Sequence, residues 1–509
     1  MYSCVRTAVV AGIEALPVRV EADVSDGLPV FEMVGFLGSE VREARERVRT
    51  ALKNSDFLLP VKRVTVNLSP ADLKKNGAGF DLAIALAILS AIGYVPPESL
   101  TGMLVAGEIG LDGAVLPIRG ILPIVTDAAK DGIRKCLIPW QNRAEGALSE
   151  ESEILPVKTI KEAVAYLNGT LEIAPVKREN VEEERPNYPD FSELQGQKLL
   201  KRACEVAVAG RHNLLMVGSA GAGKTMAAKR IPSILPPMSY EERLELSKIQ
   251  SVAGLMEEKT SLSLERPFRA PHHTITPQGM AGGGSGIVKP GEISLAHNGV
   301  LFLDELTEFM PATLELLRQP LEEQEVRLVR SGGNFRYPAD FMLVCAMNPC
   351  ACGEYPDMNR CRCTRAQLDR YIGRISKPIL DRIDICVEIP RVSFPELTKQ
   401  TAKEESSEAI RNRILAARER QKERFRGEAF RYNANIPAAG IKKYIGLGEK
   451  EQSFMEDMFT SLSLSARGYH KVLKVARTVA DLAGHENVQL SDLTEAACYR
   501  SLDRHFWER

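Results

Sequence analysis

The residues with the clearest chemistry lie in the segment NLLMVGSAGAGKT, residues 213–225, where an apolar run leads into a glycine-rich loop, a lysine and a threonine. This spacing is the G-x-x-x-x-G-K-T pattern, in which backbone N–H groups and the start of the following helix surround phosphate oxygens. We expect Lys224 to reach the β- and γ-phosphates of ATP, and the Thr225 hydroxyl to help bind Mg²⁺. The residues expected to surround the nucleotide are Gly218, Ser219, Ala220, Gly221, Ala222, Gly223, Lys224 and Thr225.

A second motif indicates that the nucleotide is hydrolysed. The segment VLFLDE, residues 300–305, is a fully apolar run that ends in two carboxylates. Such a run suits a buried parallel strand whose carboxyl end faces the nucleotide. We expect Asp304 to hold Mg²⁺ through water and Glu305 to polarise the attacking water. The pattern is weak alone, but downstream of a phosphate loop it predicts an ATPase.

Length and composition limit the class of protein. The chain has 509 residues, a length typical of about three domains. Its 26% charged residues and formal net charge of −1 are ordinary for a soluble globular protein, so nucleic-acid binding would need a local basic patch. The longest apolar run, Leu82 to Val95, is shorter than the ~20 residues of a membrane span, and we expect neither a signal peptide nor membrane contact. Ten cysteines without a secretory context favour a cytoplasmic protein with free thiols or bound metal.

The elements around these motifs divide the chain at two places. Residues 172–190 are rich in proline and charge and are predicted to form a linker. Apolar strands alternate with two helices in residues 1–171, and strands and helices alternate again over 191–391. The region 392–509 is predicted to be helical, with amphipathic helices at 406–426, 448–463, 465–483 and 491–500.

Further strings in the middle and C-terminal regions are specific enough to indicate a family. They are PFRAPHHT (267–274), GGGSGIVKPGEISLAHNG (282–299), FMLVCAMNP (341–349), KPILDRID (377–384) and LSARGYHKVLKVARTVADLA (464–483). Together with the two nucleotide motifs they resemble the magnesium-chelatase-like AAA+ ATPases of the ComM/YifB branch, over essentially the whole chain. The resemblance implies an α/β fold with a P-loop AAA+ core around a parallel sheet, an all-α C-terminal lid, and assembly into a ring, expected to be a hexamer.

The resemblance also implies roles for polar residues outside the two motifs. Asn348, at the end of the FMLVCAMNP strand, is similar to the sensor that hydrogen-bonds the attacking water or the γ-phosphate. Arg382 resembles the arginine finger that reaches the γ-phosphate of a neighbouring subunit, where such a group raises the rate by ~10³ or more. Arg467 resembles the second sensor arginine, and Gly196 with Gln197 resembles the box on the adenine side of the nucleotide.

These residues also have simpler interpretations. Arg382 is flanked by two aspartates and could form a local ion pair, and Arg467 at a helix start could be exposed to solvent. His272 and His273 are adjacent, so on a strand they would face opposite sides and would not readily bind one ion together. We interpret both histidines as structural or subunit-contact residues.

The N-terminal region resembles the proteolytic domain of Lon proteases in KKNGAGFDLAIALA (74–87) and VAGEIGLDGAVLPIRGI (105–121). In Lon the first segment carries a nucleophilic serine, and a catalytic lysine closely follows the second. Here Gly77 stands in the serine's place, and Gly120 is followed by Ile121, Leu122, Pro123 and Ile124. A serine–lysine dyad needs a hydroxyl and an amine within hydrogen-bond reach, and the nearby Ser69, Lys74 and Lys75 belong to the wrong segments. We therefore expect an α+β Lon-protease-like domain, used for ring assembly or partner binding, without protease activity.

Four cysteines form a separate candidate site. Cys350, Cys352, Cys361 and Cys363 follow a C-x-C-x₈-C-x-C spacing directly after Asn348. Two close pairs of thiolates across a short loop suit a tetrahedral structural Zn²⁺ site, although C-x-C is tighter than the commoner C-x-x-C. The alternative is four reduced thiols in an exposed loop.

A predicted hairpin indicates what the ATPase acts on. The segment EVRLVRSGGNFRY, residues 325–337, has the pattern of two alternating strands around a Ser-Gly-Gly turn, flanked by Arg327, Arg330 and Arg336. The replicative MCM helicases, which belong to the same AAA+ clade, place a DNA-contacting hairpin at this point. The resemblance therefore implies a branch-migration helicase that passes branched or single-stranded DNA through the ring pore in recombination and natural transformation. A solvated hairpin face is the simpler interpretation of the arginines. The alternatives are a chelatase-type ATPase that remodels a protein partner and an ATP-dependent protease, against which the missing dyad argues.

Overall fold

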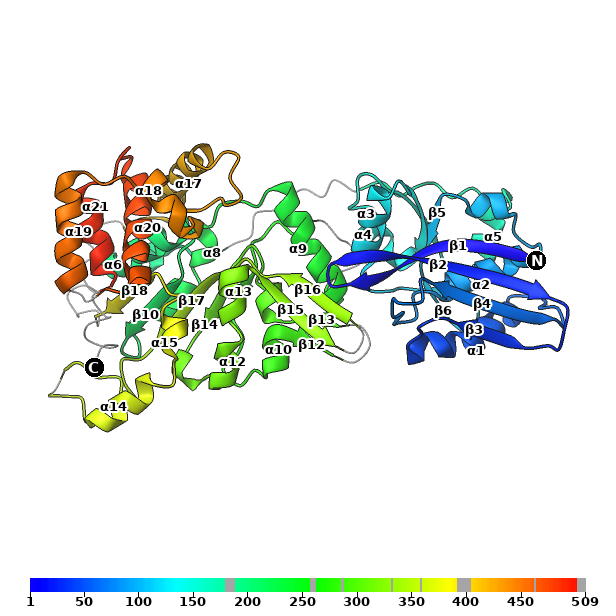
Figure 1. The fold of residues 1–509 in the computed structure, drawn as a ribbon, viewed down its shortest axis with the longest axis horizontal. Helices are drawn as coiled ribbons and strands as arrows, with labels where there is room; N and C mark the ends of the chain where they lie inside the picture. The colour runs from blue at the N-terminus through cyan, green and yellow to red at the C-terminus, as the bar shows by residue number, and fades with distance from the viewer. Residues whose placement is uncertain are drawn as a thin grey trace.

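The computed structural model describes residues 1–178, 188–256, 262–284, 288–330, 333–357, 359–390, 404–461 and 464–500. Three units lie along its long axis, with the N-terminal α/β unit at one end, the central unit in the middle and a helical unit at the other end (Figure 1). Residues 179–187 of the expected linker, the junction around residue 391 and the tip of the arginine hairpin lie outside the described residues. None of the described helices is long and apolar enough to cross a bilayer.

The N-terminal unit is built on a seven-stranded sheet of order β3–β4–β2–β1–β5–β8–β9. β1, β2 and β4 are antiparallel neighbours, whereas β3, β5, β8 and β9 join in parallel. Helix α2 (Asp81–Ala91) is buried along its whole length against this sheet, which explains the long apolar run in the sequence. The other elements are β1 (Tyr2–Ala11), β2 (Glu14–Ser25), β3 (Phe31–Val34), α1 (Ser39–Asn54), β4 (Arg63–Ser69), β5 (Met103–Val105), β6 (Glu108–Ile109), β7 (Val115–Leu116), α3 (Ile121–Lys130), β8 (Lys135–Pro139), α4 (Arg143–Gly146), β9 (Glu153–Val157) and α5 (Ile160–Leu167).

The central unit contains a five-stranded sheet of order β11–β14–β17–β10–β18, in which every neighbouring pair is parallel. β10, β14 and β17 consist only of buried residues, as expected for strands covered on both faces. Because parallel strands end at the same edge, the loops after these three strands meet at one place. The strands are β10 (Leu214–Gly218), β11 (Phe268–Arg269), β14 (Val300–Leu303), β17 (Met342–Met347) and β18 (Ile385–Ile389).

Helices and short strands surround this sheet. They are α6 (Lys198–Gly210), α7 (Lys224–Ala228), α8 (Ile231–Ile234), α9 (Tyr240–Ala253), α10 (Pro277–Ala281), β12 (Gly282–Gly283), β13 (Lys289–Pro290), α11 (Glu292–Leu295), α12 (Pro311–Glu315), α13 (Arg318–Glu323), β15 (Glu325–Arg330), β16 (Gly333–Pro338), α14 (Arg365–Ile372) and α15 (Lys377–Leu380). β15 and β16 form a separate antiparallel hairpin, which confirms the two strands expected there.

The helical unit contains α17 (Ser407–Arg424), α18 (Ile441–Tyr444), α19 (Glu449–Ser461), α20 (Ala466–Ala483) and α21 (Leu490–Cys498). The four longer helices agree with the four that the sequence predicts. Buried residues of α17 and α20 share one hydrophobic core with α6 and with strands of the central sheet. The helical unit is therefore packed directly on the ATPase core, and the expected α/β fold with an all-α C-terminal region is confirmed.

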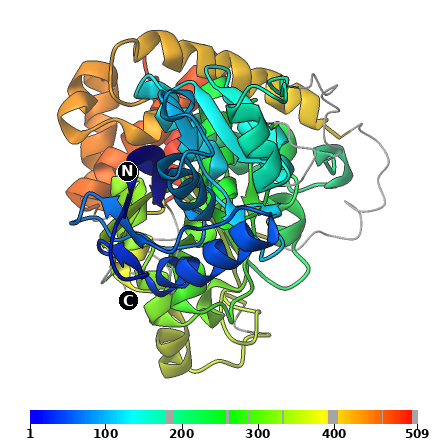
Figure 2. The ribbon, with the colours of Figure 1, turned by 90° about the vertical axis from the view of Figure 1, so that its right-hand side faces the viewer.

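Among the described residues, the N-terminal unit contacts the central unit through α3 and through the turn between β1 and β2. Helix α3 packs on α9, where the Ser251 hydroxyl donates a hydrogen bond of 2.5 Å to Glu145 Oε1. The second contact is the turn between β1 and β2, where Gly12 lies against the backbone of Arg336 in β16. Viewed along the long axis, the N-terminal sheet lies in front of the central unit (Figure 2).

Candidate nucleotide-binding site

The glycine-rich loop connects β10 to α7 at the carboxyl edge of the central sheet. Gly221 and Gly223 have φ values of 78° and 89°, a left-handed conformation that turns the loop sharply around its centre. The Lys224 ammonium donates to the Gly218 carbonyl at 2.6 Å and to Asn348 Oδ1 at 3.2 Å. Burial lowers the pKa of Lys224, and the nearby Asp304 carboxylate offsets part of that effect. The structure thus brings Asn348 from the end of β17 beside the lysine of the loop.

The candidate Mg²⁺ ligands also lie together. The Thr225 hydroxyl donates to Asp304 Oδ2 at 2.7 Å, although 79 residues separate them in the chain. A hydroxyl and a carboxylate are hard oxygen ligands, and Mg²⁺ typically takes one or two such groups together with phosphate oxygens and water. The donor set at the mouth of the phosphate loop therefore fits the expected ion.

Glu305 occupies a sharp turn directly after the second strand motif. Its φ of 51° lies in the left-handed region, and its backbone N–H donates to Asp304 Oδ1 at 3.0 Å. The Glu305 side chain is 61% exposed, and Oε2 lies 3.5 Å from His273 Nδ1. This turn keeps Glu305 beside Asp304 at the sheet edge, with the Glu305 carboxylate near His273.

The arrangement of His272 and His273 differs from the expected one, in which they would face opposite sides of a strand. β11 ends at Arg269, before the histidines, and the rings of His272 and His273 lie 4.0 Å apart. Since a loop does not alternate side chains as a strand does, both rings can stack on the same side. The contact of His273 with Glu305 was missed from the sequence, where only the PFRAPHHT string marked these residues.

Gln197 lies next to the phosphate loop, as the family pattern implies. Its φ of 48° is left-handed, and its side-chain amide donates to the Ala222 carbonyl at 3.2 Å and to the Pro390 carbonyl at 2.9 Å. The amide therefore connects the phosphate loop to the residue that follows β18.

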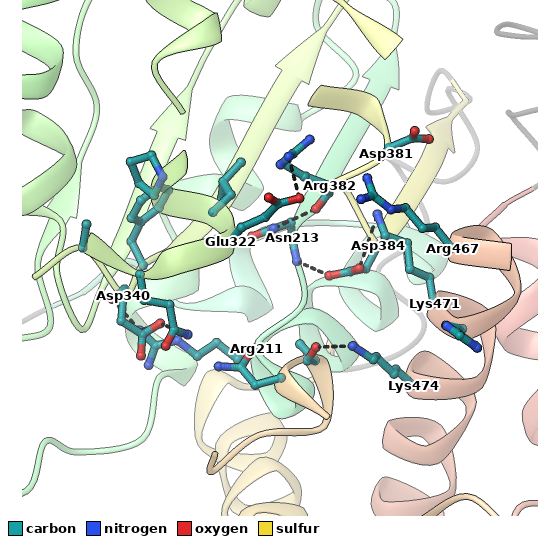
Figure 3. Close-up of a pocket in the computed structure, with 18 of the residues that line it drawn as sticks. Arg211, Asn213, Glu322, Asp340, Asp381, Arg382, Asp384, Arg467, Lys471 and Lys474 are labelled. Atoms are coloured by element: carbon teal, nitrogen blue, oxygen red, sulfur yellow. Dashed lines mark hydrogen bonds and ion pairs between the residues drawn. The ribbon is translucent and has the colours of Figure 1, made fainter. Parts of the chain in front are cut away.

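Arg382 and Arg467 lie together in a different place, a cavity of about 310 Å³ between the central and helical units (Figure 3). The Arg382 guanidinium donates to the Pro378 carbonyl and to Glu322 Oε1, both at 2.5 Å. The simpler interpretation of Arg382, an ion pair with an adjacent aspartate, is therefore not what the structure shows, because Arg382 pairs with Glu322 of α13. Arg467, in the first turn of α20, is exposed and lines the same cavity.

The four cysteines come together in the loop after β17. The Sγ atom of Cys350 lies 3.3 Å from that of Cys352 and 3.9 Å from that of Cys361, and the ligand atoms of all four cysteines lie within 4.8 Å of one another. A tetrahedral zinc with Zn–S bonds of about 2.3 Å would hold its sulfurs about 3.8 Å apart, so this arrangement fits Zn²⁺. A hydrogen bond from the Glu354 backbone lowers the pKa of Cys352 to about 6, whereas burial raises the pKa of Cys361, so the support for a metal site is the geometry of the four sulfurs.

The arginine hairpin has Arg327 directly opposite Arg336, and Arg330 opposite Gly333. All three arginines are exposed, but the Arg327 guanidinium pairs with Glu325 of its own strand. The Arg330 guanidinium lies near Gly283, because a Cβ at that glycine would be 3.2 Å from Arg330 Nη2. The hairpin therefore presents a basic edge, and within its described residues neither Arg330 nor Arg336 has a carboxylate directly opposite it.

A parallel sheet of this strand order, with a phosphate loop after one central strand and an acidic pair after another, defines a P-loop ATPase of the AAA+ class. Sequence models of the magnesium chelatase subunit ChlI match residues 20–142 and 190–397, and a model of its C-terminal region matches residues 404–500. The chain is 39% identical over 502 residues to the YifB protein of Salmonella typhimurium, covering 98% of this chain and 97% of that protein. It is 40% identical over 500 residues to the competence protein ComM of Haemophilus influenzae, covering 97% and 96%. The chain belongs to the ComM/YifB family of magnesium-chelatase-like AAA+ ATPases.

The resemblance of the N-terminal region to Lon proteases is also found in the comparisons. Lon protease 2 of Bacillus subtilis is 31% identical over 146 residues, which are 27% of this chain and 26% of that protein. Lys75, one of the two lysines near Ser69, is fully buried and donates to the Pro70 carbonyl. The structure thus holds this lysine in the loop between β4 and α2, bonded to the backbone of the same loop.

Proposed function

We propose that this ATPase assembles into a hexameric ring that moves branched or single-stranded DNA through its pore, in the manner of a branch-migration helicase. The observation that carries the proposal is the β15–β16 hairpin, which lies in the chain between β14, the Asp304–Glu305 strand, and β17, the Asn348 strand, and forms a separate sheet. An exposed basic edge on a hairpin suits a phosphate backbone, and six copies around a pore would give a strong local field on a chain of net charge −1. The relative named competence protein ComM supports a role in recombination and the uptake of transforming DNA.

The nucleotide site would work as follows. Lys224 and the loop amides bind the phosphates, Gln197 borders the base, and Glu305 orients and polarises the attacking water. Mg²⁺, held by Thr225 and through water by Asp304, would neutralise phosphate charge. Asn348, 3.2 Å from the Lys224 ammonium, is positioned to sense the γ-phosphate.

Arg382 and Arg467 would act on the nucleotide of the adjacent subunit. The cavity that holds them is lined by α13, the segment before β17, the turn after α15, and the helical unit. A guanidinium delivered across a subunit boundary stabilises the charge that develops in the transition state. ATP turnover should therefore rise steeply with protein concentration, and an Arg382→Ala protein should bind ATP but hydrolyse it slowly.

We further propose that Cys350, Cys352, Cys361 and Cys363 hold a structural Zn²⁺. The four thiols brace the loop that follows Asn348 and leads to α14. Such a site contributes to folding of the loop and has no role in the chemistry of hydrolysis.

The experiment that tests the DNA motor is the ATPase rate with and without four-way or forked DNA. Arg330→Ala should keep basal turnover, lose DNA stimulation, and lower the salt dependence of binding by about one unit per lost phosphate contact. Arg45→Ala, which removes an exposed arginine of α1 in the N-terminal unit, is the matched control and should behave as wild type. If assembled wild-type rings neither bind DNA at low salt nor respond to it, a chelatase-type ATPase that remodels a protein partner replaces this proposal.

A further inference from the structure

Lys471 connects the turn that carries Arg382 with the helix that carries Arg467. Its ammonium donates to the Ile383 carbonyl at 2.8 Å and lies 3.6 Å from Asp384 Oδ1. Lys471 stands four residues after Arg467 on α20, so the two side chains share one face of that helix. Figure 3 shows Arg382, Arg467 and Lys471 converging on the same cavity. One lysine therefore joins the two elements that present the arginines.

The same turn is fixed from the opposite side by Asn213, the residue directly before β10. Its side-chain amide donates to the Arg382 carbonyl at 2.8 Å, and its backbone N–H donates to Asp384 Oδ2 at 3.1 Å. Its side-chain oxygen accepts from the Leu343 N–H at 2.9 Å, which ties the contact to β17. The turn is thus braced against the sheet by Asn213 and against the helical unit by Lys471, together with Arg500, which donates to the same Ile383 carbonyl at 3.0 Å.

The Lys471 contact is sheltered from solvent. The side chains of Lys471 and Asp384 are each 14% exposed. Burial lowers the pKa of Lys471 to about 8, and Asp384 opposes that effect. Burial alone would raise the pKa of Asp384, but Lys471 and the neighbouring His212 hold it below its usual range. A sheltered, charge-assisted contact is stiffer and stronger than a surface ion pair.

We propose that Lys471 is a positioning residue that makes Arg382 and Arg467 a single unit for the γ-phosphate of the neighbouring subunit. The proposal rests on the proposed action of these arginines across the subunit boundary. The Arg382 guanidinium must exchange Glu322 for phosphate, so the backbone of the turn decides whether it reaches its target. An error of about 1 Å in placing such a group can lower the rate by ~10²-fold.

The test compares Lys471→Met with Lys474→Met in the full-length protein. Lys474 lies less than one turn further along α20 and lines the same cavity, but its ammonium donates to the Ala434 carbonyl at 2.9 Å and makes no hydrogen bond to the described residues of the Arg382 turn. Lys471→Met should lower kcat by about tenfold or more and leave KM for ATP within about threefold. Lys474→Met should stay within about threefold of wild type in both constants. Lys471→Arg, which keeps a donor and a charge, should recover most of the rate.

Mixing variants separates positioning from general stability. Lys224→Ala has a disabled pocket but an intact arginine unit, so mixed rings with Lys471→Met should regain turnover. A Lys471→Met protein with wild-type kcat, or equal losses in Lys471→Met and Lys474→Met without recovery on mixing, would overturn the inference. Should Lys471→Met not fold, Asp384→Asn should give the same loss of kcat and the same recovery, and a wild-type kcat there would also overturn it. If Arg382→Ala itself turns over ATP at the wild-type rate, the proposed action of Arg382 across the subunit boundary is refuted, independently of Lys471.

Discussion

The contact between the β1–β2 turn and the arginine hairpin can be tested at a single glycine. Gly12 has a φ of 72°, and a Cβ at this position would lie 2.2 Å from the Arg336 carbonyl oxygen. A backbone carbonyl within a strand pair cannot rotate away from such a clash. Val10 and Ile13, on either side of Gly12, pack on the core that contains Phe335 of the hairpin. Gly12→Ala should therefore lift the turn from β16.

The size of the effect follows from a matched control. Gly93 has a φ of 89°, and a Cβ there would meet no atom within 4 Å. Both alanine variants carry the strain of a left-handed residue, about 1 kcal/mol. Only Gly12→Ala also loses the apolar contacts of two half-buried side chains, about 1 kcal/mol each. The expected free-energy losses are about 3 kcal/mol for Gly12→Ala and about 1 kcal/mol for Gly93→Ala.

Hydrogen exchange of the β15–β16 amides measures the difference in stability between the two variants in the hairpin itself. An extra loss of about 2 kcal/mol corresponds to roughly 30-fold faster opening of the hairpin in Gly12→Ala, with no change in Gly93→Ala. DNA stimulation of the ATPase should fall in the same variant, because the hairpin loses its support. Equal hairpin exchange in the two variants would show that the turn does not support β16 and would refute the reasoning.

Three further changes test the metal site, the catalytic carboxylate and a buried acid. Purified protein should contain about one zinc per chain by elemental analysis, and Cys361→Ser should lower that content and expose the loop to protease; a folded, active, metal-free protein would argue against zinc. His273→Ala should lower kcat about threefold to tenfold with unchanged ATP affinity, because the Glu305 carboxylate loses a neighbour that restricts its position. His272→Ala should have the kcat of the wild type. Equal kcat values in the two variants would contradict this role of His273. Burial raises the pKa of Asp81 to about 6, so the stability that this group contributes is complete below about pH 4 and is lost as pH rises through 6. The free energy of unfolding should therefore fall by about 3 kcal/mol over this pH range in the wild type, and Asp81→Asn should remove that fall. The same fall in Asp81→Asn would count against this role of Asp81.

The nucleotide site is predictable from the sequence because its parts are short and local. The phosphate loop and the acidic pair each follow a buried strand, and parallel strands bring their carboxyl ends together. This rule accounts for the contacts that the structure shows between Lys224 and Asn348 and between Thr225 and Asp304, although the role of Asn348 was inferred from the family resemblance. The C-terminal helices are predictable for a similar reason, since an amphipathic period needs no distant partner.

The partners of charged side chains are not predictable in this way. Arg382 has two aspartates close to it in sequence but pairs with Glu322, which is 60 residues away. Likewise, α17 has the alternating charges of a surface helix, yet its Arg424 pairs with the buried Asp481 of α20. A charge pattern shows which residues can form ion pairs, but tertiary packing decides which of them meet. Lys471 could have been found from its i,i+4 spacing to Arg467, whereas nothing in the sequence marks Glu322.

The segment after Gly120 lies where a Lon protease carries its catalytic lysine, and in this protein it forms part of the contact with α9. Leu122, in the stretch where a Lon protease carries its lysine, is fully buried and packs with Leu148 and Leu262, against α9 of the ATPase core. The Leu122 N–H donates to Glu145 Oε1, the atom that also accepts from the Ser251 hydroxyl of α9. A lysine ammonium in this apolar contact would be costly to bury without a partner. The apolar residue here therefore contributes to the surface that joins the N-terminal unit to the ATPase core, in the stretch where a Lon protease carries the lysine of its dyad.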